Sequence, residues 1–166
     1  FQYIIDKYRN VKLVFLGDSW QPAAEGLPKD RIEYCKFVGL DVYPLKLASM
    51  FFDICVAPIE GTEFDQCKSN IKWLEAAALK VPIVATDSEP YKEIQNGVTG
   101  FKCKNEDFTQ YVCRLIEDEN LRKTIGQNAY DFCKINYDQS KVCWMWRDLF
   151  KELLESNTRS TNEVNG

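Results

Sequence analysis

Short apolar runs recur along the chain, each bounded by glycine, proline or charged residues. Runs of about four to eight residues between turn-forming residues are typical of buried strands. The pattern therefore predicts five strands, at residues 12–16, 32–38, 53–58, 81–86 and 98–103. Pro82 fits the start of the fourth run, where a strand tolerates the missing N–H.

Segments with apolar residues at helical spacing separate most of these runs, and more of them follow the last run. We expect helices at residues 42–52, 68–79, 89–95, 106–118, 119–135 and 138–155. Strands that alternate with helices indicate βαβ units, which close into a parallel sheet covered by helices on both faces. The predicted fold class is therefore α/β, a Rossmann-like doubly wound parallel sheet in one domain over 1–155. The polar stretch 156–166 is expected to be a disordered tail.

Composition narrows the class of protein. A length of 166 residues fits one domain, and a net charge of -4 disfavours nucleic acid as a partner. No apolar run reaches the roughly 18 residues of a membrane-spanning helix, so we expect a cytoplasmic protein that reaches a membrane only through a missing part. Because the chain begins with Phe1 rather than Met, we expect it to be a piece of a longer protein.

The cysteines and the lack of histidine limit the chemistry. There are seven cysteines and no histidine, and the cysteines lack C-x-x-C spacing. Nucleophilic schemes that need a Ser-His or Cys-His pair are therefore excluded. We predict small buried cysteines in a reducing compartment, without a metal site.

In doubly wound folds, ligands bind beyond the carboxyl ends of the strands. The segments that reach this edge of the predicted sheet include Gly17, Gly39 with Leu40, the loop 58–70 and residues 86–90. Both glycines suit tight strand ends first, and close approach of a ligand second.

The loop 58–70 leads into Lys68, Ser69 and Asn70 at an expected helix start. A helix N-terminus offers unpaired N–H groups and partial positive charge, which together form an anion site. Lys68, Lys72 and Glu75 have i, i+4 and i+7 spacing, so we expect them on one helix face. Two ammonium groups would then lie near a diphosphate, with a carboxylate that can accept both ribose hydroxyls.

Simpler interpretations of these residues stay open. In these interpretations, Ser69 or Asn70 only caps the helix, and Lys72 with Glu75 forms a solvated pair. The acidic residues Glu60, Glu63 and Asp65 could bind a cation, although carboxylates in a loop are usually only solvated.

The last expected helix carries an aromatic group made of Trp144, Met145, Trp146 and Phe150. It could stack against a carbohydrate, but core or interdomain packing is the favoured interpretation at this spacing.

The stretch IKWLEAAALKVPIVAT at 71–86 resembles the helix-strand unit of group 1 glycosyltransferases, also called glycosyltransferase family 4. The stretch EPYKEIQNGVTGF at 89–101 resembles their next unit, and residues 13–18 and 37–39 fit the opening strands. The likeness covers roughly residues 11–136.

This resemblance implies a GT-B fold, in which two Rossmann-like domains face a cleft. The chain would be the C-terminal domain, which grips a nucleotide-diphosphate sugar, while a missing N-terminal domain holds the acceptor. The implied reaction is retaining and metal-independent and needs no cofactor, and glycan or cell-surface polysaccharide synthesis is its expected role. The resemblance places Lys68, Ser69 and Asn70 at the diphosphate and sugar. Glu75 matches the second, ribose-binding glutamate of the Glu-x7-Glu motif, and Lys68 and Glu75 are the expected catalytic pair.

The chain departs from the family pattern at Cys67, which stands where the first motif glutamate belongs. The alternatives are that Glu63 or Asp65 supplies the missing acceptor, or that the sugar is bound differently. The alternative function is therefore a non-catalytic GT-B-like binding or assembly module. A sugar-nucleotide epimerase fits less well, because it would need acid-base residues of its own.

Overall fold

The computed structural model describes residues 1–17 and 24–163. Asp18, which directly follows Gly17 at the expected ligand edge, lies outside them. The strands are β1 (Leu13–Leu16), β2 (Ile32–Cys35), β3 (Cys55–Ala57), β4 (Ile83–Thr86) and β5 (Phe101–Cys103). The α-helices are α1 (Gln2–Lys7), α2 (Tyr43–Ser49), α3 (Glu63–Gln66), α4 (Ile71–Ala78), α5 (Phe108–Glu117), α6 (Glu119–Asn136) and α7 (Gln139–Glu163). Short 3-10 helices are η2 (Lys29–Arg31), η3 (Glu89–Tyr91) and η4 (Asn105–Asp107).

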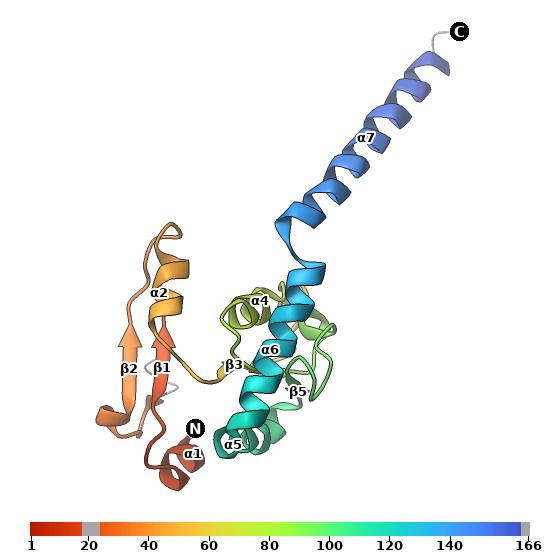
Figure 1. The fold of residues 1–166 in the computed structure, drawn as a ribbon. Helices are drawn as coiled ribbons and strands as arrows, with labels where there is room; N and C mark the ends of the chain where they lie inside the picture. Colours follow the sequence, from red (N-terminus) through yellow and green to blue (C-terminus); the bar gives the residue numbers. More distant parts are fainter. Residues whose placement is uncertain (18–23, 164–166) are drawn as a thin grey trace.

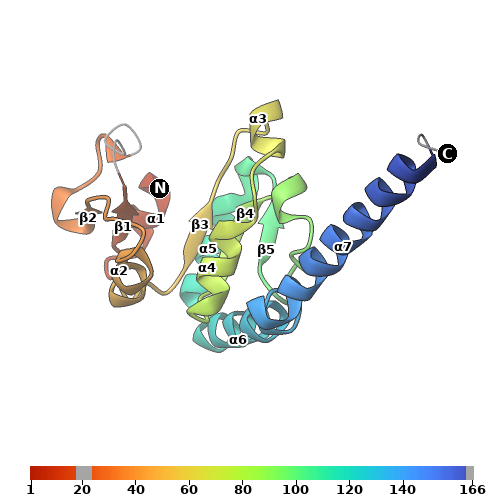
Figure 2. The ribbon, with the colours of Figure 1, turned by 90° about the horizontal axis from the view of Figure 1, so that it is seen from above.

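All five strands run parallel to their hydrogen-bonded neighbours, as the α/β prediction requires. They form two sheets within the described residues, with orders β1-β2 and β3-β4-β5, where one continuous sheet was expected. Strands of the two sheets also run in different directions: Figure 1 shows β1 and β2 in the plane of the view, whereas β4 lies in the plane of Figure 2. The carboxyl ends of β1 and β2 therefore do not share an edge with those of β3 and β4.

The three-stranded sheet is covered on both faces, which makes β4 the centre of the core. Ile83 and Ala85 of β4 pack in a cluster with Trp73 and other residues of α4 and α6. Val84 packs on the opposite face with residues of α1 and α5. This alternation follows from the two-residue period of a strand, and it buries every residue of β4. By contrast, all four residues of β1 are only half-buried.

Helix α4 buries one face, which is formed by Trp73, Ala76 and Ala77. Ile71, at the start of the helix, is 50% exposed. The fully buried Trp73 indole donates from Nε1 to the backbone oxygen of Thr99 at 3.0 Å, which satisfies its polar atom inside the core.

Close contact between α6 and the turn after α4 depends on Gly126. A Cβ added at Gly126 would lie 1.9 Å from the backbone oxygen of Lys80. Lys80 itself has a positive φ of 58°, so the chain turns sharply there before β4. Only glycine lets α6 approach this turn, and the approach closes one face of the core.

Helix α7 leaves the body of the molecule and extends away from the sheet (Figures 1 and 2). It continues to Glu163, so the tail expected from residue 156 is helical over most of its length. The reason is local: the segment 139–163 contains neither glycine nor proline to interrupt a helix. Trp144, Met145, Trp146 and Phe150 are exposed on α7. Among the described residues, none of the helices is both long and apolar enough to cross a membrane.

Candidate active site

The segment after β3 contains a short helix where a polar loop was expected. Thr62 caps α3 by accepting a hydrogen bond from the Asp65 N–H at 3.2 Å. In return, Asp65 Oδ2 accepts from the N–H groups of Thr62 and Gly61 at 3.1 Å and 3.0 Å. This reciprocal arrangement is a capping box, and it buries Asp65 to 5% exposure. Glu63 lies in the first turn of α3 and is exposed.

Lys68 is held by the same carboxylate. Its Nζ lies 2.5 Å from Asp65 Oδ1 and 5.1 Å from the centre of the Phe64 ring. The hydrogen bond from Lys68 is the main cause that lowers the pKa of Asp65 to about 2. Both oxygens of Asp65 thus accept hydrogen bonds from the chain itself. The Lys68 side chain remains 43% exposed, so its ammonium group is accessible to a ligand.

The helix α4 begins at Ile71, three residues later than predicted. Lys68 and Ser69 therefore precede the helix, and Lys68 does not share a helix face with Lys72 and Glu75. The cause is the turn that ends α3, in which the Lys68 N–H donates to the Asp65 backbone oxygen at 3.2 Å. Ser69 is exposed in this connection.

Asn70 occupies the N-cap position of α4, but its side chain does not cap the helix. Its Nδ2 donates to the Tyr137 hydroxyl at 2.8 Å, and this hydroxyl donates to Glu93. Burial is the main cause that raises the pKa of Tyr137 to about 12, so the phenol stays protonated and keeps its hydrogen for Glu93. Asn70 thus ties the start of α4 to the end of α6.

Lys72 and Glu75 do lie together, and a tyrosine from another helix joins them. Lys72 Nζ lies 3.2 Å from Glu75 Oε2. The hydroxyl of Tyr43, at the start of α2, donates to the same Oε2 at 3.0 Å and accepts from Lys72 Nζ at 3.2 Å. The Glu75 side chain is 20% exposed and that of Lys72 is 55% exposed. The three groups therefore form a half-buried polar cluster between α2 and α4, rather than a solvated pair on one helix.

The protonation states of this cluster follow from its packing. Burial raises the pKa of Tyr43, which keeps the phenol protonated at neutral pH. For Lys72, burial lowers the pKa, but the hydrogen bonds and charges of Tyr43 and Glu75 outweigh it and the net direction is upward. Lys72 therefore remains an ammonium group and Tyr43 a hydrogen-bond donor.

The segment that contains β1, β2 and α2 includes Gly17, Gly39 and Leu40. Gly17 follows β1 with a φ of 123° and donates its N–H to Cys35 O at 3.0 Å. The backbone oxygen of Gly39 accepts from the N–H of Tyr43 at 2.9 Å, so this glycine starts α2. Leu40 is 81% exposed. The structure thus connects Gly39 to the Glu75 cluster through Tyr43, while Gly17 and Leu40 make no hydrogen bond to α3 or α4 among the described residues.

A match to a known protein family covers most of the chain. The family described as "Glycosyl transferases group 1" matches residues 1–118 of the chain. The chain belongs to the group 1 glycosyltransferases. One relative, the capsular polysaccharide biosynthesis glycosyltransferase CapM of Staphylococcus aureus, is 36% identical over 75 residues, which make up 43% of this chain and 20% of CapM.

Solved structures agree with this membership. The C-terminal domain of LpcC, a group 1 family protein from Francisella tularensis, matches with a TM-score of 0.54 at 25% identity, covering 66% of this chain and 55% of that one. Anabaena HepE in complex with UDP-glucose matches with a TM-score of 0.65 at 18% identity, covering 87% of this chain and 42% of that one. The predicted family and GT-B fold are confirmed. The chain spans from 20% of CapM to 55% of the LpcC domain.

The resemblance stated above is what aligns Cys67 with the first motif glutamate. Cys67 ends α3 and is exposed, and its thiol is free. Of the two candidate replacements, Asp65 has both carboxylate oxygens engaged by Lys68 and the capping box, whereas Glu63 is exposed. Glu63 is therefore the better placed of the two to accept a new hydrogen bond.

The cysteines and acidic residues were also compared with the requirements of a metal site. No cluster there of three or more cysteine, aspartate or glutamate side chains is placed to hold a metal ion. Burial raises the pKa of Cys103 and of Cys133 to about 11, so both thiols stay protonated at neutral pH.

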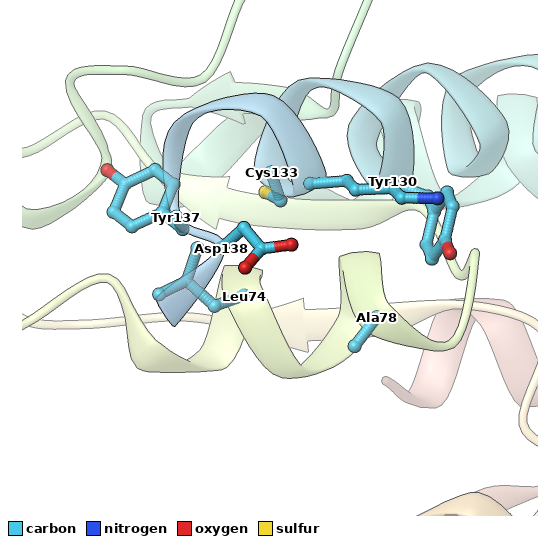
Figure 3. A pocket seen from close by; sticks show the side chains of 7 residues that line it. Leu74, Ala78, Tyr130, Cys133, Tyr137 and Asp138 are labelled. Carbon is cyan, nitrogen blue, oxygen red and sulfur yellow. The ribbon is translucent and has the colours of Figure 1, made fainter. Parts of the chain in front are cut away.

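A groove of about 290 Å³ lies elsewhere, between α4 and α6 (Figure 3). Leu74, Ala78, Tyr130, Cys133, Lys134, Tyr137 and Asp138 line it. Tyr43, Lys72 and Glu75 are not among these lining residues, so the groove and the Glu75 cluster have no residue in common.

Tyr43 was not among the residues predicted from the sequence, although its hydroxyl connects α2 to Glu75 on α4. Its signal was the Gly39–Tyr43 stretch, which connects the end of β2 to the start of α2. Such a strand-to-helix connection is where binding groups are expected in α/β folds.

Proposed function

We propose that this chain is the donor-binding domain of a glycosyltransferase that binds a nucleotide-diphosphate sugar. The observation that supports the proposal most directly is the hydrogen bonding of the two Glu75 carboxylate oxygens. Its Oε2 is fixed by Lys72 and Tyr43, and no hydrogen bond from a described residue reaches its Oε1. A carboxylate with one oxygen fixed and the other available can accept a hydrogen bond from a ribose hydroxyl.

The lysines provide the charge that a diphosphate needs. Lys72 lies beside Glu75, and Lys68 lies just before the start of α4, where unpaired N–H groups add partial positive charge. In the proposed complex, Lys68 turns from Asp65 toward the diphosphate. Both ammonium groups then stabilise the charge that develops as the diphosphate leaves.

The finer features of the reaction are part of the same proposal. Transfer would be retaining and metal-independent, and the acceptor would be held by an N-terminal domain. HepE was solved with UDP-glucose, and CapM acts in capsular polysaccharide biosynthesis. The first supports a uridine donor, and the second supports a role in polysaccharide synthesis.

Ligand binding tests the proposal directly. In titration calorimetry of the full-length protein with UDP and UDP-glucose, we expect Lys68→Ala and Glu75→Gln each to weaken binding by about tenfold or more, since each removes a charge-assisted contact. Lys123→Ala is the matched control, because Lys123 forms an exposed ion pair with Glu119 on α6. Equal affinity of all variants, or no binding of either ligand by the unmodified protein at millimolar concentration, would refute the proposal.

The second candidate function is a non-catalytic binding module. Cys67 in the place of the first motif glutamate favours it, because a thiol does not replace a carboxylate acceptor. A transfer assay separates the two: an enzyme releases UDP in the presence of acceptor, whereas a module binds UDP-glucose without turnover. Recovery or increase of turnover in Cys67→Glu would show that this position limits the reaction.

A further inference from the structure

Tyr43 is the first residue of α2, yet its hydroxyl lies at the proposed donor site on α4. It donates to Glu75 Oε2 at 3.0 Å and accepts from Lys72 Nζ at 3.2 Å. Lys72 Nζ also donates to the same Oε2 at 3.2 Å. The three groups close a triangle, so the Glu75 carboxylate is fixed from two directions.

Backbone hydrogen bonds before α2 fix the position of Tyr43 at the start of the helix. The Gly39 oxygen accepts from the N–H groups of Val42 and Tyr43 at 3.0 Å and 2.9 Å. A proline, Pro44, lies in the first turn of α2, where its fixed φ suits a helix start. The phenol therefore extends toward α4 from a well-defined helix start.

Burial makes the phenol a dependable donor. Tyr43 is half-buried, and burial raises its pKa, so its hydroxyl hydrogen is present throughout the neutral range. The Lys72 ammonium also lies 5.7 Å from the centre of the Tyr43 ring, which adds a cation–π contact to the hydrogen bond. Because a tyrosine has only two rotatable side-chain bonds, this arrangement restrains Glu75 at small entropic cost.

We propose that Tyr43 is a positioning residue, which holds Oε2 of Glu75 so that Oε1 faces the ribose hydroxyls of the donor. The inference rests on the proposed function. It also gives the β1–β2–α2 unit a role in donor recognition, because Tyr43 couples the position of α2 to the carboxylate on α4. Selection for ribose over deoxyribose would then depend on a residue that does not touch the sugar.

A double-mutant cycle tests this role in the full-length protein. Affinities for UDP and for UDP lacking both ribose hydroxyls are measured by calorimetry for Tyr43→Phe, Glu75→Gln and the double variant. Tyr43→Phe should weaken UDP binding about three- to tenfold, within the range for the net contribution of one ordinary hydrogen bond. It should leave binding of the dideoxy ligand unchanged, and in the Glu75→Gln background it should have no further effect.

The ratio of the two affinities within one sample cancels any unfolded fraction, so the result does not depend on full stability of the variant. Tyr130→Phe is the control, since that tyrosine is on α6 at the separate groove. Suppose that Glu75→Gln weakens UDP binding. In that case, an unchanged UDP affinity in Tyr43→Phe, or an equal loss for both ligands, overturns the inference. If Glu75→Gln also binds UDP normally, the proposed function itself fails.

Discussion

Replacing Gly126 by alanine tests whether α6 must touch the turn before β4. In an exposed helix this change stabilises by about 1 kcal/mol, because alanine has the higher helix propensity. Here the new Cβ would lie 1.9 Å from the Lys80 oxygen and 2.6 Å from its carbonyl carbon. Both atoms are backbone, so α6 must move away. Overpacking of this kind costs about 1–3 kcal/mol or more, and we expect a net loss of about 2 kcal/mol.

Urea unfolding followed by circular dichroism measures the change as a shift in midpoint at constant slope. The matched control is Thr124→Ala on the exposed side of the same helix, which should stabilise by a few tenths of a kcal/mol. The two alanines should therefore move the midpoint in opposite directions. If Gly126→Ala raised stability like the control, the close approach of α6 to Lys80 would be wrong.

Two further predictions concern the site loop and the core. Since the folded pKa of Asp65 is about 2, below its ordinary value of 3.8, its charge stabilises the protein above about pH 4 and this contribution is lost as pH falls toward 2. The difference in stability between the unmodified protein and Asp65→Asn should thus shrink over this window in acid titrations; a constant difference would exclude the ion pair with Lys68. Trp73→Phe should cost roughly 2–4 kcal/mol in urea unfolding, because it leaves a cavity and an unpaired Thr99 oxygen. A cost below about 1 kcal/mol would mean that Trp73 is not tightly packed.

Local pattern was enough to predict the strands and most helices. The run at 81–86 is apolar throughout because β4 is buried on both faces, and the structure has β4 at Ile83–Thr86. The joining of the strands was not predictable in the same way. An apolar run indicates burial but does not name the neighbour, and β1 is only half-buried and pairs with β2 alone. The expected single sheet is therefore two sheets.

The start of α4 shows how a neighbouring element overrides helix propensity. Nothing in Lys68, Ser69 or Asn70 forbids a helix, so the pattern predicted one from Lys68. The preceding capping box between Thr62 and Asp65 creates α3, and the turn that ends it occupies these residues. Its signal is present in the sequence as a threonine followed three residues later by an acid.

Tyr43 could not be found by periodicity, because it is 32 residues away from Glu75. Helical spacing relates residues within one element, and here it identified Lys72 and Glu75 correctly as neighbours. A partner from another element depends on how α2 packs beside α4. The candidate site was therefore predictable on one helix, and the contact across helices required the structure.

The two lysines differ in how easily each can change partner. Asp65 keeps the Gly61 and Thr62 donors on its Oδ2 when Lys68 leaves Oδ1, so the buried carboxylate stays hydrogen-bonded. Lys72 is bound both to Glu75 and to Tyr43, and its departure would leave Tyr43 alone to hold Glu75 Oε2. Because Asp65 keeps its other donors, Lys68 is the lysine suited to follow the diphosphate in the proposed complex. Lys72 is suited to stay in place and keep Glu75 oriented.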